Sequence, residues 1–452
     1  MADNNIDRIP PQANDAEMAV IGSMLIEKEA IIKVLDKVRD SDFYKEAHKH
    51  IFRMIQSLYL DNQPIDAITV AARLKKENLL DAAGGPAYLT EMINFVSTAA
   101  NVEHYAAIVR EKSVLRQLIT VGTDIVGSAF SEKRSAEEIL DAAESTLYKV
   151  SELGTAKGFT PISELVHPML ETLEKLHANK KDVPGLRTGF DEFDKYTAGL
   201  QPAELILLAA RPSMGKTALG LNIVENVGLV DKKPVAMFSL EMSKEQLMLR
   251  LLCSAAQVDS HKTRQGYIAS QSWSKLTTVA AKIAEAPIYI DDSSSLSVME
   301  LRTRARRLAT ELKVQGKELS LIVIDYIQMM RGVGRAESRQ QEMAEISRSL
   351  KGLARDLNVP VIALSQLSRK TEEKGREGKP QLSDLRESGA LEQDADVVCF
   401  IFREGYYRRD DPDLERKATL ILAKQRNGPT GEIELAFIRE FTRFENVVRT
   451  EA

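Results

Sequence analysis

Residues 204–217 read Glu-Leu-Ile-Leu-Leu-Ala-Ala-Arg-Pro-Ser-Met-Gly-Lys-Thr, an apolar run that passes into a glycine-containing loop before a helical pattern begins at Ala218. Apart from Ala210 at the first position, residues 210–217 match G-x-x-x-x-G-K-[ST], the pattern of a phosphate-binding loop. In such a loop Gly215 permits close approach of the backbone, Lys216 supplies a positive charge, and Thr217 offers a hydroxyl to Mg²⁺. The segment therefore predicts a strand, a phosphate site and a helix in succession.

Similar apolar runs continue along the chain. They cover residues 235–240, 319–324 and 361–365, and helical segments separate them. This alternation is typical of a parallel sheet with crossover helices. Three later runs, at residues 397–402, 418–423 and 432–437, are closely spaced and predict that the sheet ends in antiparallel strands.

A polar residue follows each of three predicted strands, namely Glu241, Asp325 and Gln366. Because ligands of an open α/β sheet bind outside the carboxyl ends of its strands, we expect these side chains to face the phosphate loop. Asp325 would hold Mg²⁺, Glu241 would orient and deprotonate an attacking water, and Gln366 would sense the γ-phosphate.

The rest of the chain has a different texture. The first 150 residues show helical spacing of apolar positions. Glycines and prolines between residues 154 and 186 bracket one amphipathic stretch with Leu165, Met169, Leu173 and Leu176 on one side. We predict an all-helical N-terminal domain at residues 1–152, a linker with a helix at 153–186 and an α/β domain at 187–452.

Length and composition exclude several classes of protein. The 452 residues, 44% hydrophobic and 28% charged, exclude a disordered or collagen-like chain and predict two or more domains. Two cysteines can form neither a disulfide framework nor a four-thiolate zinc site. No apolar run approaches about 18 residues, so we expect no membrane association and a location in the cytoplasm.

In combination these motifs resemble the replicative DNA helicases of the DnaB family. The resemblance runs through residues 9–22, Thr188-Gly-Phe-Asp191, the loop at 210–217, Ser239-Leu-Glu-Met-Ser243, Ile324-Asp-Tyr-Ile-Gln328, residues 384–396 and Lys424-Gln-Arg-Asn-Gly428. Ala210, which departs from the general phosphate-loop pattern, is what this family carries.

The resemblance implies a RecA-like ATPase domain, a helical collar, a linker helix that docks on the adjacent subunit, and a homohexameric ring around single-stranded DNA. It implies that Glu241 and Lys216 are catalytic and that ATP with Mg²⁺ is bound. The nucleotide-binding residues would be Ser213, Gly215, Lys216, Thr217, Ala218 and Arg250, beside the Gln366 predicted from its strand. Lys424 and Arg426 would reach a neighbouring subunit's γ-phosphate, unless they are simply a solvated strand end.

The DNA contacts implied by the resemblance are Arg386, Glu387 and Gly389, placed on a loop that faces the pore. For Arg335 and Arg339 a mobile surface loop and a DNA contact remain equal alternatives. The net charge of −5 argues against a protein that coats nucleic acid, but residues 301–380 hold 17 basic and 10 acidic side chains. This distribution favours enclosed contact with DNA over a basic exterior.

We therefore predict an ATP-dependent replicative helicase that moves 5′ to 3′ on one strand at the fork, with primase and a helicase loader as partners and a place at the nucleoid. Polarity, partners and the replication role come from the resemblance. Two alternatives remain from the residues alone: a RecA-like recombination or repair ATPase, and a loader-type regulatory ATPase that does not unwind DNA.

Overall fold

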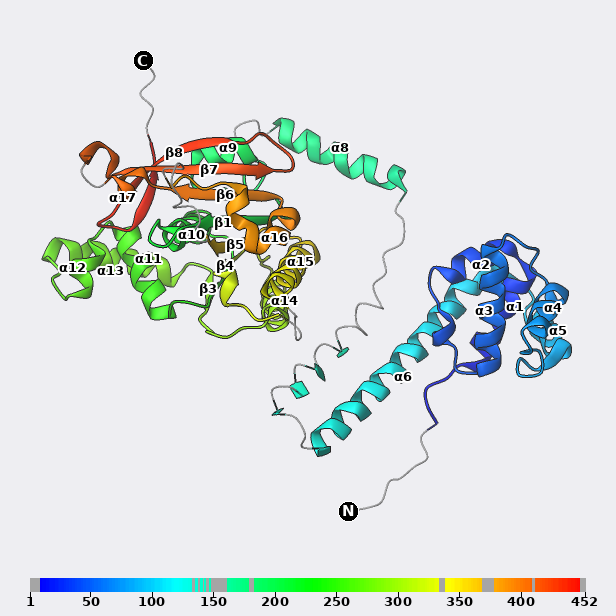
Figure 1. Cartoon of the computed structure of the whole chain (residues 1–452). Coiled ribbons are helices and arrows are strands. Elements are labelled where there is room, and N and C mark those ends of the chain that lie inside the picture. Colours follow the sequence, from blue (N-terminus) through cyan, green and yellow to red (C-terminus); the bar gives the residue numbers. More distant parts are fainter. Residues whose placement is uncertain are drawn as a thin grey trace. The chain divides into compact units, whose positions relative to one another are not determined.

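The computed structural model of the chain describes residues 9–131, 135–136, 139–140, 142–143, 146–147, 161–178, 183–332, 338–367, 378–408 and 411–447. It divides into two compact units, residues 1–165 and 166–452 (Figure 1). The division falls inside the segment 153–186 that the sequence predicts as a linker. The limits predicted at 152 and 186 stay predictions.

The first unit is helical, as predicted. Its α-helices are α1 (Asn14–Ile26), α2 (Lys28–Leu35), α3 (Glu46–Leu60), α4 (Ala67–Lys76), α5 (Gly85–Phe95) and α6 (Val102–Ser131), with short 3-10 turns η1 (Asp40–Asp42) and η2 (Ala99–Asn101) between them. Buried aliphatic side chains and the rings of Phe43 and Phe52 form one core. The helices build this core because their apolar residues recur on one face.

Buried ionic groups fix the turns of this unit. The Asp42 carboxylate is fully buried and accepts hydrogen bonds from Arg110 (2.6 Å) and the Ser113 hydroxyl (2.6 Å), both on α6, and from the Arg39 backbone N–H (2.8 Å). His48 is also buried, with Nδ1 2.6 Å from the Glu17 carboxylate. The buried charged residues of the helical unit therefore have a structural role, because they hold its helices and turns together.

The second unit is built on a nine-stranded sheet. Its strands are β1 (Leu205–Ala210), β2 (Val235–Ser239), β3 (Ile288–Asp291), β4 (Leu321–Asp325), β5 (Val361–Gln366), β6 (Val397–Phe402), β7 (Lys417–Gln425), β8 (Gly431–Ile438) and β9 (Arg443–Asn446). The order is β3-β2-β4-β5-β1-β6-β7-β8-β9. The first six strands in this order are parallel, and β7, β8 and β9 continue the sheet in antiparallel register.

Helices cover both faces of this sheet. Residues of β1 alternate between two cores, with Ile206 and Leu208 facing α10 and with Leu205 and Leu207 facing the opposite layer that contains α14 and α15. Figure 1 shows α14 and α15 together beside the parallel strands. The helices are α9 (Asp191–Thr197), α10 (Lys216–Glu225), α11 (Lys244–Ala256), α12 (Ser260–Arg264), α13 (Ser270–Ala284), α14 (Val298–Val314), α15 (Arg339–Leu357), α16 (Gly389–Asp394) and α17 (Glu404–Tyr407), with short helical turns at Asn226–Val230, Ile327–Met329, Leu382–Ser388 and Pro412–Leu414.

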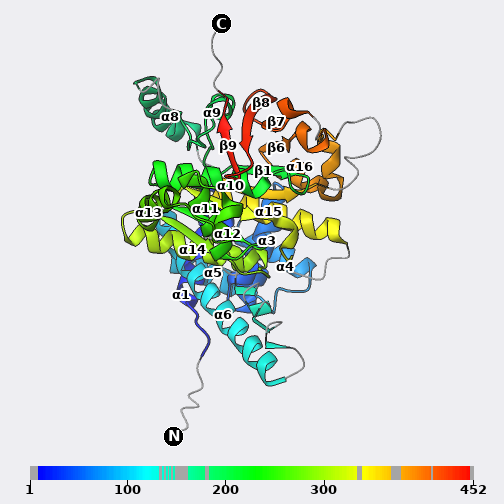
Figure 2. The same ribbon diagram turned by 90° about the vertical axis from the view of Figure 1, so that its left-hand side faces the viewer.

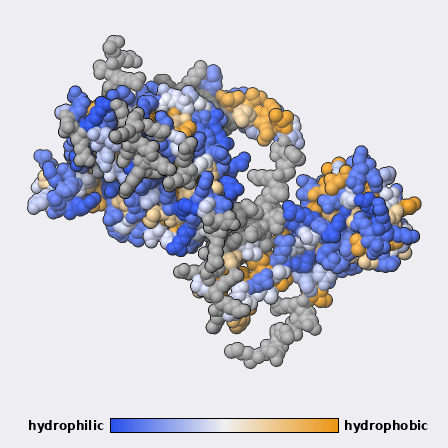
Figure 3. Space-filling model, in the orientation of Figure 1, coloured by the Kyte–Doolittle hydropathy of each residue, from blue (hydrophilic) through white to orange (hydrophobic). Residues whose placement is uncertain are grey.

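The predicted linker helix is present as α8 (Ile162–Ala178). Its apolar residues Leu165, Met169 and Leu173 are each more than half exposed, and they lie on the hydrophobic patch that Figure 3 shows along this helix. The side chain of Leu176 lies outside the described residues. An amphipathic helix with an exposed apolar face is typical of a surface that packs against a partner.

Some expectations from the sequence differ from the structure. The run 397–402, which the sequence predicts to belong to the antiparallel end of the sheet, forms β6 and pairs in parallel with β1. The antiparallel part begins on the other side of β6, where it pairs with β7. Trp273, the single tryptophan of the chain, is 59% exposed on α13 and therefore does not belong to the core. Of the described helices, none has the length and apolar content needed to cross a membrane.

Candidate nucleotide-binding and catalytic site

A cavity of about 760 Å³ opens at the carboxyl ends of the parallel strands. Eight of the predicted site residues line it together: Ser213, Gly215, Lys216, Thr217, Ala218, Glu241, Arg250 and Gln366. They come from the loop after β1, the first turn of α10, the turn after β2, helix α11 and the end of β5. The sheet thus brings together side chains that lie up to 153 positions apart in the sequence.

The phosphate loop has the backbone geometry that its residue types predict. Ser213 and Gly215 both have positive φ, +66° and +101°, and Gly215 is the N-cap of α10. A Cβ at Gly215 would lie 2.8 Å from Phe444 Cζ, so the glycine is required both for its φ and for the space. The loop therefore presents the positive end of α10 to the cavity, where an anion is stabilised.

Asp325 joins the loop to the sheet. Its carboxylate is fully buried at the end of β4 and accepts a 2.7 Å hydrogen bond from the Thr217 hydroxyl. Lys216 Nζ lies 3.4 Å from the other carboxylate oxygen and 3.9 Å from the centre of the Tyr326 ring. Burial lowers the pKa of Lys216, and the negative charge of Asp325 opposes that shift.

This pair of oxygen ligands fits Mg²⁺. Asp325 Oδ1 is buried and, among the described residues, makes an ion pair with Lys216 at 3.4 Å but accepts no hydrogen bond, so it retains capacity to bind a cation. Mg²⁺ prefers oxygen ligands and keeps several of its waters. The Thr217 hydroxyl and the Asp325 carboxylate would hold the ion, which when bound neutralises charge on the phosphates.

Glu241 is held by the turn that follows β2. The Ser239 hydroxyl donates to the Met242 carbonyl (2.7 Å) and accepts from the Met242 N–H (3.2 Å), and the Leu240 N–H donates to the Asp325 carbonyl (2.7 Å). These bonds fix the backbone on both sides of Glu241, while its side chain is exposed and lines the cavity. The carboxylate is therefore available to a water molecule in the cavity.

Arg250 and Gln366 complete the wall. Burial and the neighbouring positive charge of Arg264 lower the pKa of Arg250. Because two cations share one side of the cavity, an anion bound there is favoured. At the end of β5, the Gln366 N–H donates to Gln328 Oε1 (3.2 Å), and the Gln328 amide donates to Ser365 Oγ (2.8 Å). These bonds hold Gln366 at the edge of the phosphate site.

Lys424 and Arg426 lie near the amino ends of the parallel strands, whereas the cavity lies at the carboxyl ends. Gln425 pairs with Val397 at the start of β6, whereas the phosphate loop follows the far end of β1. Val397 pairs with Ile206, four residues before Ala210, which corresponds to about 13 Å along the strand. Neither side chain belongs to the described lining of the cavity.

Both cations bind the carboxyl end of α16 instead. Lys424 Nζ donates to the carbonyls of Glu392 (2.5 Å), Gln393 (3.2 Å) and Ala395 (2.8 Å). The Arg426 guanidinium donates to the Gln393 carbonyl (3.0 Å). Burial is the main cause that lowers the pKa of Lys424, followed by the charge of Arg426. Arg426 is exposed, as expected for a residue at a solvated strand end. Lys424 fits that alternative less well, because it is half-buried and donates to three carbonyls.

The structure describes the predicted DNA contacts only in part. The backbone of Arg386 and Glu387 lies in the 3-10 turn Leu382–Ser388, but their side chains lie outside the described residues, as does Arg335. Gly389 is the first residue of α16. Arg339 begins α15 and donates to the Gln328 carbonyl (2.6 Å).

Part of the basic surplus of residues 301–380 is used within the chain. Arg302 and Arg306 both pair with Asp356, at 2.9 and 2.6 Å, and Arg304 pairs with Asp291 at 2.8 Å. Arg302 and Arg306 thus join α14 to α15, and Arg304 joins α14 to β3, so these arginines do not count as a free surface for DNA.

No sequence motif indicates the wall of the cavity that Arg264 and the C-terminal strands form. Arg264, Phe437 and Thr442 line it, and Phe444 packs beneath Gly215 with its ring centre 4.7 Å from that of Phe437. Phe437 and Phe444 come from β8 and β9, more than 200 residues after the phosphate loop. They carry no motif, and only long-range sheet pairing brings them to the site.

Sequence comparison assigns this architecture to a known family. Residues 185–446 match the DnaB-like helicase C terminal domain, and residues 9–111 match the DnaB-like helicase N terminal domain. The chain belongs to the DnaB-like helicase family. Membership confirms the predicted resemblance, the α/β ATPase fold preceded by a helical domain, and the predicted enzyme class of a replicative DNA helicase that hydrolyses ATP.

Relatives that match nearly the whole chain belong to the same family. The chain is 43% identical to the replicative DNA helicase DnaB of Geobacillus stearothermophilus over 444 residues, which covers 98% of this chain and 96% of the relative. It is 42% identical to the replicative DNA helicase DnaC of Bacillus subtilis over 452 residues, with 99% and 98% covered. A solved structure of a DnaB-like replicative helicase and its interactions with primase is 32% identical, with a TM-score of 0.73, and covers 96% of this DnaB-like chain and 100% of its own.

Proposed function

We propose that this DnaB-like helicase binds Mg²⁺-ATP in the cavity after β1 and hydrolyses it with Glu241 as the catalytic base. Ser213, Gly215, Lys216, Thr217 and Ala218 would bind the phosphates, with Arg250 and Gln366 at the γ-phosphate side. The support is their convergence on one cavity at the carboxyl ends of the strands, where charge that develops on the phosphates meets fixed cations.

A second part of the proposal, that Lys424 and Arg426 act on a neighbouring subunit, is supported by the distance of both residues from this cavity. Because both lie at the amino end of the parallel strands, they cannot reach a nucleotide on their own subunit. Their role at a γ-phosphate requires the cavity of a neighbour, as for a cation supplied in trans in other phosphoryl-transfer enzymes. In such an assembly the nucleotide cavity of one subunit meets the surface of the next subunit that carries Lys424 and Arg426. Repeated contacts between two different surfaces form a closed ring when the rotation between subunits returns to the first one, which is consistent with the proposed homohexamer.

Helix α16 would connect this interface to DNA. Gly389 begins the helix directly after the turn with Arg386 and Glu387, and Lys424 holds its last carbonyls. A shift of Lys424 toward a neighbour's nucleotide would therefore release or move the segment proposed to hold the DNA backbone. Phosphate contacts of this kind carry no base sequence, as 5′-to-3′ movement on any single strand requires.

The remaining parts receive roles by the same proposal. The exposed apolar face of α8 would dock on the adjacent subunit, and the helical unit would form a collar that receives primase and a helicase loader. The primase named with the solved relative supports that partner. The protein would act in the cytoplasm at the nucleoid.

A mixing experiment tests the trans assignment. Lys216→Ala inactivates the cavity of its own subunit, and Lys424→Ala inactivates only the site on its neighbour. Mixed rings would contain intact sites, formed by Lys216 of one variant and Lys424 of the other. We expect each variant alone to lose DNA-stimulated ATP hydrolysis and the mixture to regain part of it. Failure of the mixture to recover would contradict the assignment.

The two alternatives, a recombination ATPase and a loader-type ATPase, are not favoured. Relatives that span nearly the whole chain, the helical unit included, are replicative helicases. No feature of the described cavity distinguishes the alternatives from a helicase.

A further inference from the structure

Strand β9 holds the phosphate-loop helix at both of its ends. Arg443 Nη1 binds both carboxylate oxygens of Glu225, the last residue of α10, at 2.7 and 2.8 Å. The Phe444 N–H donates to Asn222 Oδ1 (2.9 Å), and the Phe444 ring lies against Gly215 at the start of the helix. Figure 2 shows β9 beside α10. Contacts spread over ten residues, or about 15 Å of helix, fix its tilt and rotation.

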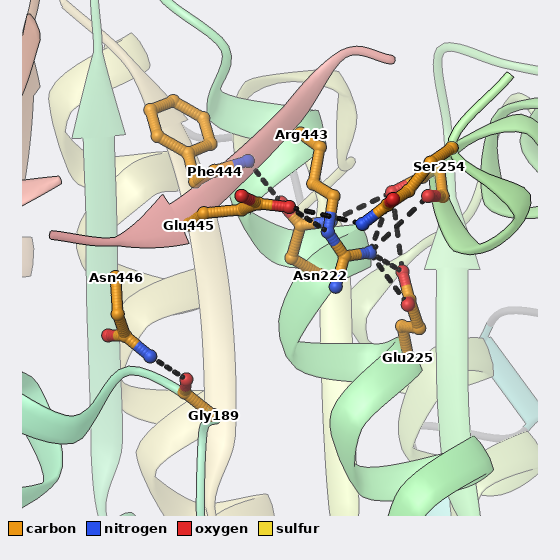
Figure 4. Close-up of polar contacts among 9 residues, drawn as sticks. Gly189, Asn222, Glu225, Ser254, Arg443, Phe444, Glu445 and Asn446 are labelled. Atoms are coloured by element: carbon orange, nitrogen blue, oxygen red, sulfur yellow. Dashed lines mark hydrogen bonds and ion pairs between the residues drawn. The ribbon is translucent and has the colours of Figure 1, made fainter. Parts of the chain in front are cut away.

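The same arginine also joins α10 to α11. Arg443 Nη1 lies 3.2 Å from the Ser254 hydroxyl, which donates to Glu225 (3.3 Å) and accepts from the Asn222 amide (3.1 Å). Figure 4 shows these four side chains pointing toward one another, with Ser254 on a separate helix. Ser254 follows Arg250 by four residues, so the two share one face of α11. The network therefore sets the position of Arg250 relative to Lys216 and Thr217.

The network is buried and does not belong to the nucleotide site. Asn222, Glu225 and Ser254 are 7, 9 and 4% exposed, and Arg443 is not among the described residues that line the cavity. Its Nε also lies 3.3 Å from Glu445. The contacts that join β9 to α10 and α11 come from one nitrogen, Nη1, which donates to Glu225 and to Ser254. The planar guanidinium holds this nitrogen in a fixed direction, whereas the flexible side chain of lysine carries a compact ammonium that does not reproduce this geometry.

We propose that Arg443 is a positioning residue for ATP hydrolysis, which fixes α10 and α11 so that Arg250 and the phosphate loop act on the same nucleotide. The inference rests on the proposed roles of Arg250 and Lys216. It adds a residue that touches no substrate and acts through the Glu225 and Ser254 contacts.

The test is a double-mutant cycle in the full-length chain with ATP and Mg²⁺. Arg443→Lys should lower kcat of ATP hydrolysis by roughly 10- to 100-fold, as expected when reacting groups are misplaced, with KM changed by less than about threefold. In an Arg250→Ala background the same change should lower kcat by less than about threefold, because Arg250 is the group that Arg443 positions. A general loss of fold would instead reduce both backgrounds alike.

Two further variants keep the test decisive. Lys417→Met removes an exposed ion pair with Glu434 on the same antiparallel sheet and should leave kcat unchanged. If Arg443→Lys does not fold, Ser254→Ala removes only the α11 side of the network and should lower kcat several-fold in the same non-additive manner. Additive effects, or wild-type kcat in Ser254→Ala, would overturn the inference. If Arg250→Ala alone left kcat unchanged, the proposed role of Arg250 would fall, and the positioning role with it.

Discussion

Replacement of Gly215 by alanine adds a single methyl group at the most constrained point of the phosphate loop. The φ of Gly215 is +101°, where an L-residue is strained by about 1–3 kcal/mol. The new Cβ would lie 2.8 and 2.9 Å from two atoms of the Phe444 ring, which is 2% exposed and cannot swing into solvent. Overpacking of this kind costs about 1–3 kcal/mol. The two effects together predict a loss of roughly 2–6 kcal/mol in the free energy of unfolding of the ATPase unit.

Thermal unfolding of the full-length variant measures this loss. At about 2–4 °C per kcal/mol for a domain of 150–250 residues, the transition of the ATPase unit should fall by roughly 4–24 °C. Titration with a fluorescent ATP analogue should also show at least about tenfold weaker binding, because the loop must move its N–H groups away from the phosphates to make room.

A matched control separates strain from contact. Gly266 also has a positive φ, +83°, but a Cβ there would meet nothing within 4 Å. Gly266→Ala should therefore lose only about 1–2 kcal/mol and keep its affinity for the analogue. Phe444→Leu should restore part of the stability of Gly215→Ala. If Gly215→Ala were no less stable than Gly266→Ala, the packing of β9 beneath the loop would not constrain the site.

Further expectations concern charge and chemistry. Glu241→Gln should lower kcat by about 10²–10⁴-fold with little change in the melting temperature, because the side chain is exposed and acts only on water; steady-state hydrolysis with calorimetry checks this, and equal activity would remove Glu241 as the base. Because the pKa of Lys216 is lowered, this lysine loses its positive charge at a lower pH than an ordinary lysine, and both kcat/KM and nucleotide affinity should fall as the pH rises through that range. Arginine keeps its charge there, so the nucleotide affinity of Lys216→Arg should not fall with pH. Asp42→Ala removes a fully buried carboxylate that pairs with Arg110 and accepts a hydrogen bond from Ser113, and it should destabilise the helical unit by about 3–5 kcal/mol, measured by its urea transition, while analogue binding is retained. Burial raises the pKa of the Cys399 thiol, so it should resist alkylation at pH 8 until the sheet unfolds.

The parts of the fold that the sequence could predict are local. Runs of apolar residues, bounded by turns, located β1, β2, β4 and β5 to within two residues at each end, because strands buried on both faces are apolar along most of their length. The residue after a strand is fixed by the strand itself, so the sheet brought Glu241, Asp325 and Gln366 to the loop as expected. The same logic identified the amphipathic pattern of α8.

The parts that it could not predict depend on distant pairing. β9 is four residues long and contains one buried apolar side chain, which is too short a pattern to indicate a strand. Arg443 meets Glu225 across 218 positions, and nothing near either residue indicates the pair. Lys424 was assigned to a neighbour's nucleotide by resemblance, but its contacts with the end of α16 follow from the register of β6 and β7.

Strand displacement on a forked DNA substrate tests the central claim most directly. The full-length protein, with ATP and Mg²⁺, should release the partner strand from a fork that has a free 5′ single-stranded tail, and not from one that offers only a 3′ tail. Glu241→Gln should bind the same fork and release no strand. Hydrolysis of ATP that is stimulated by the fork but releases no strand from the wild-type protein would contradict the account.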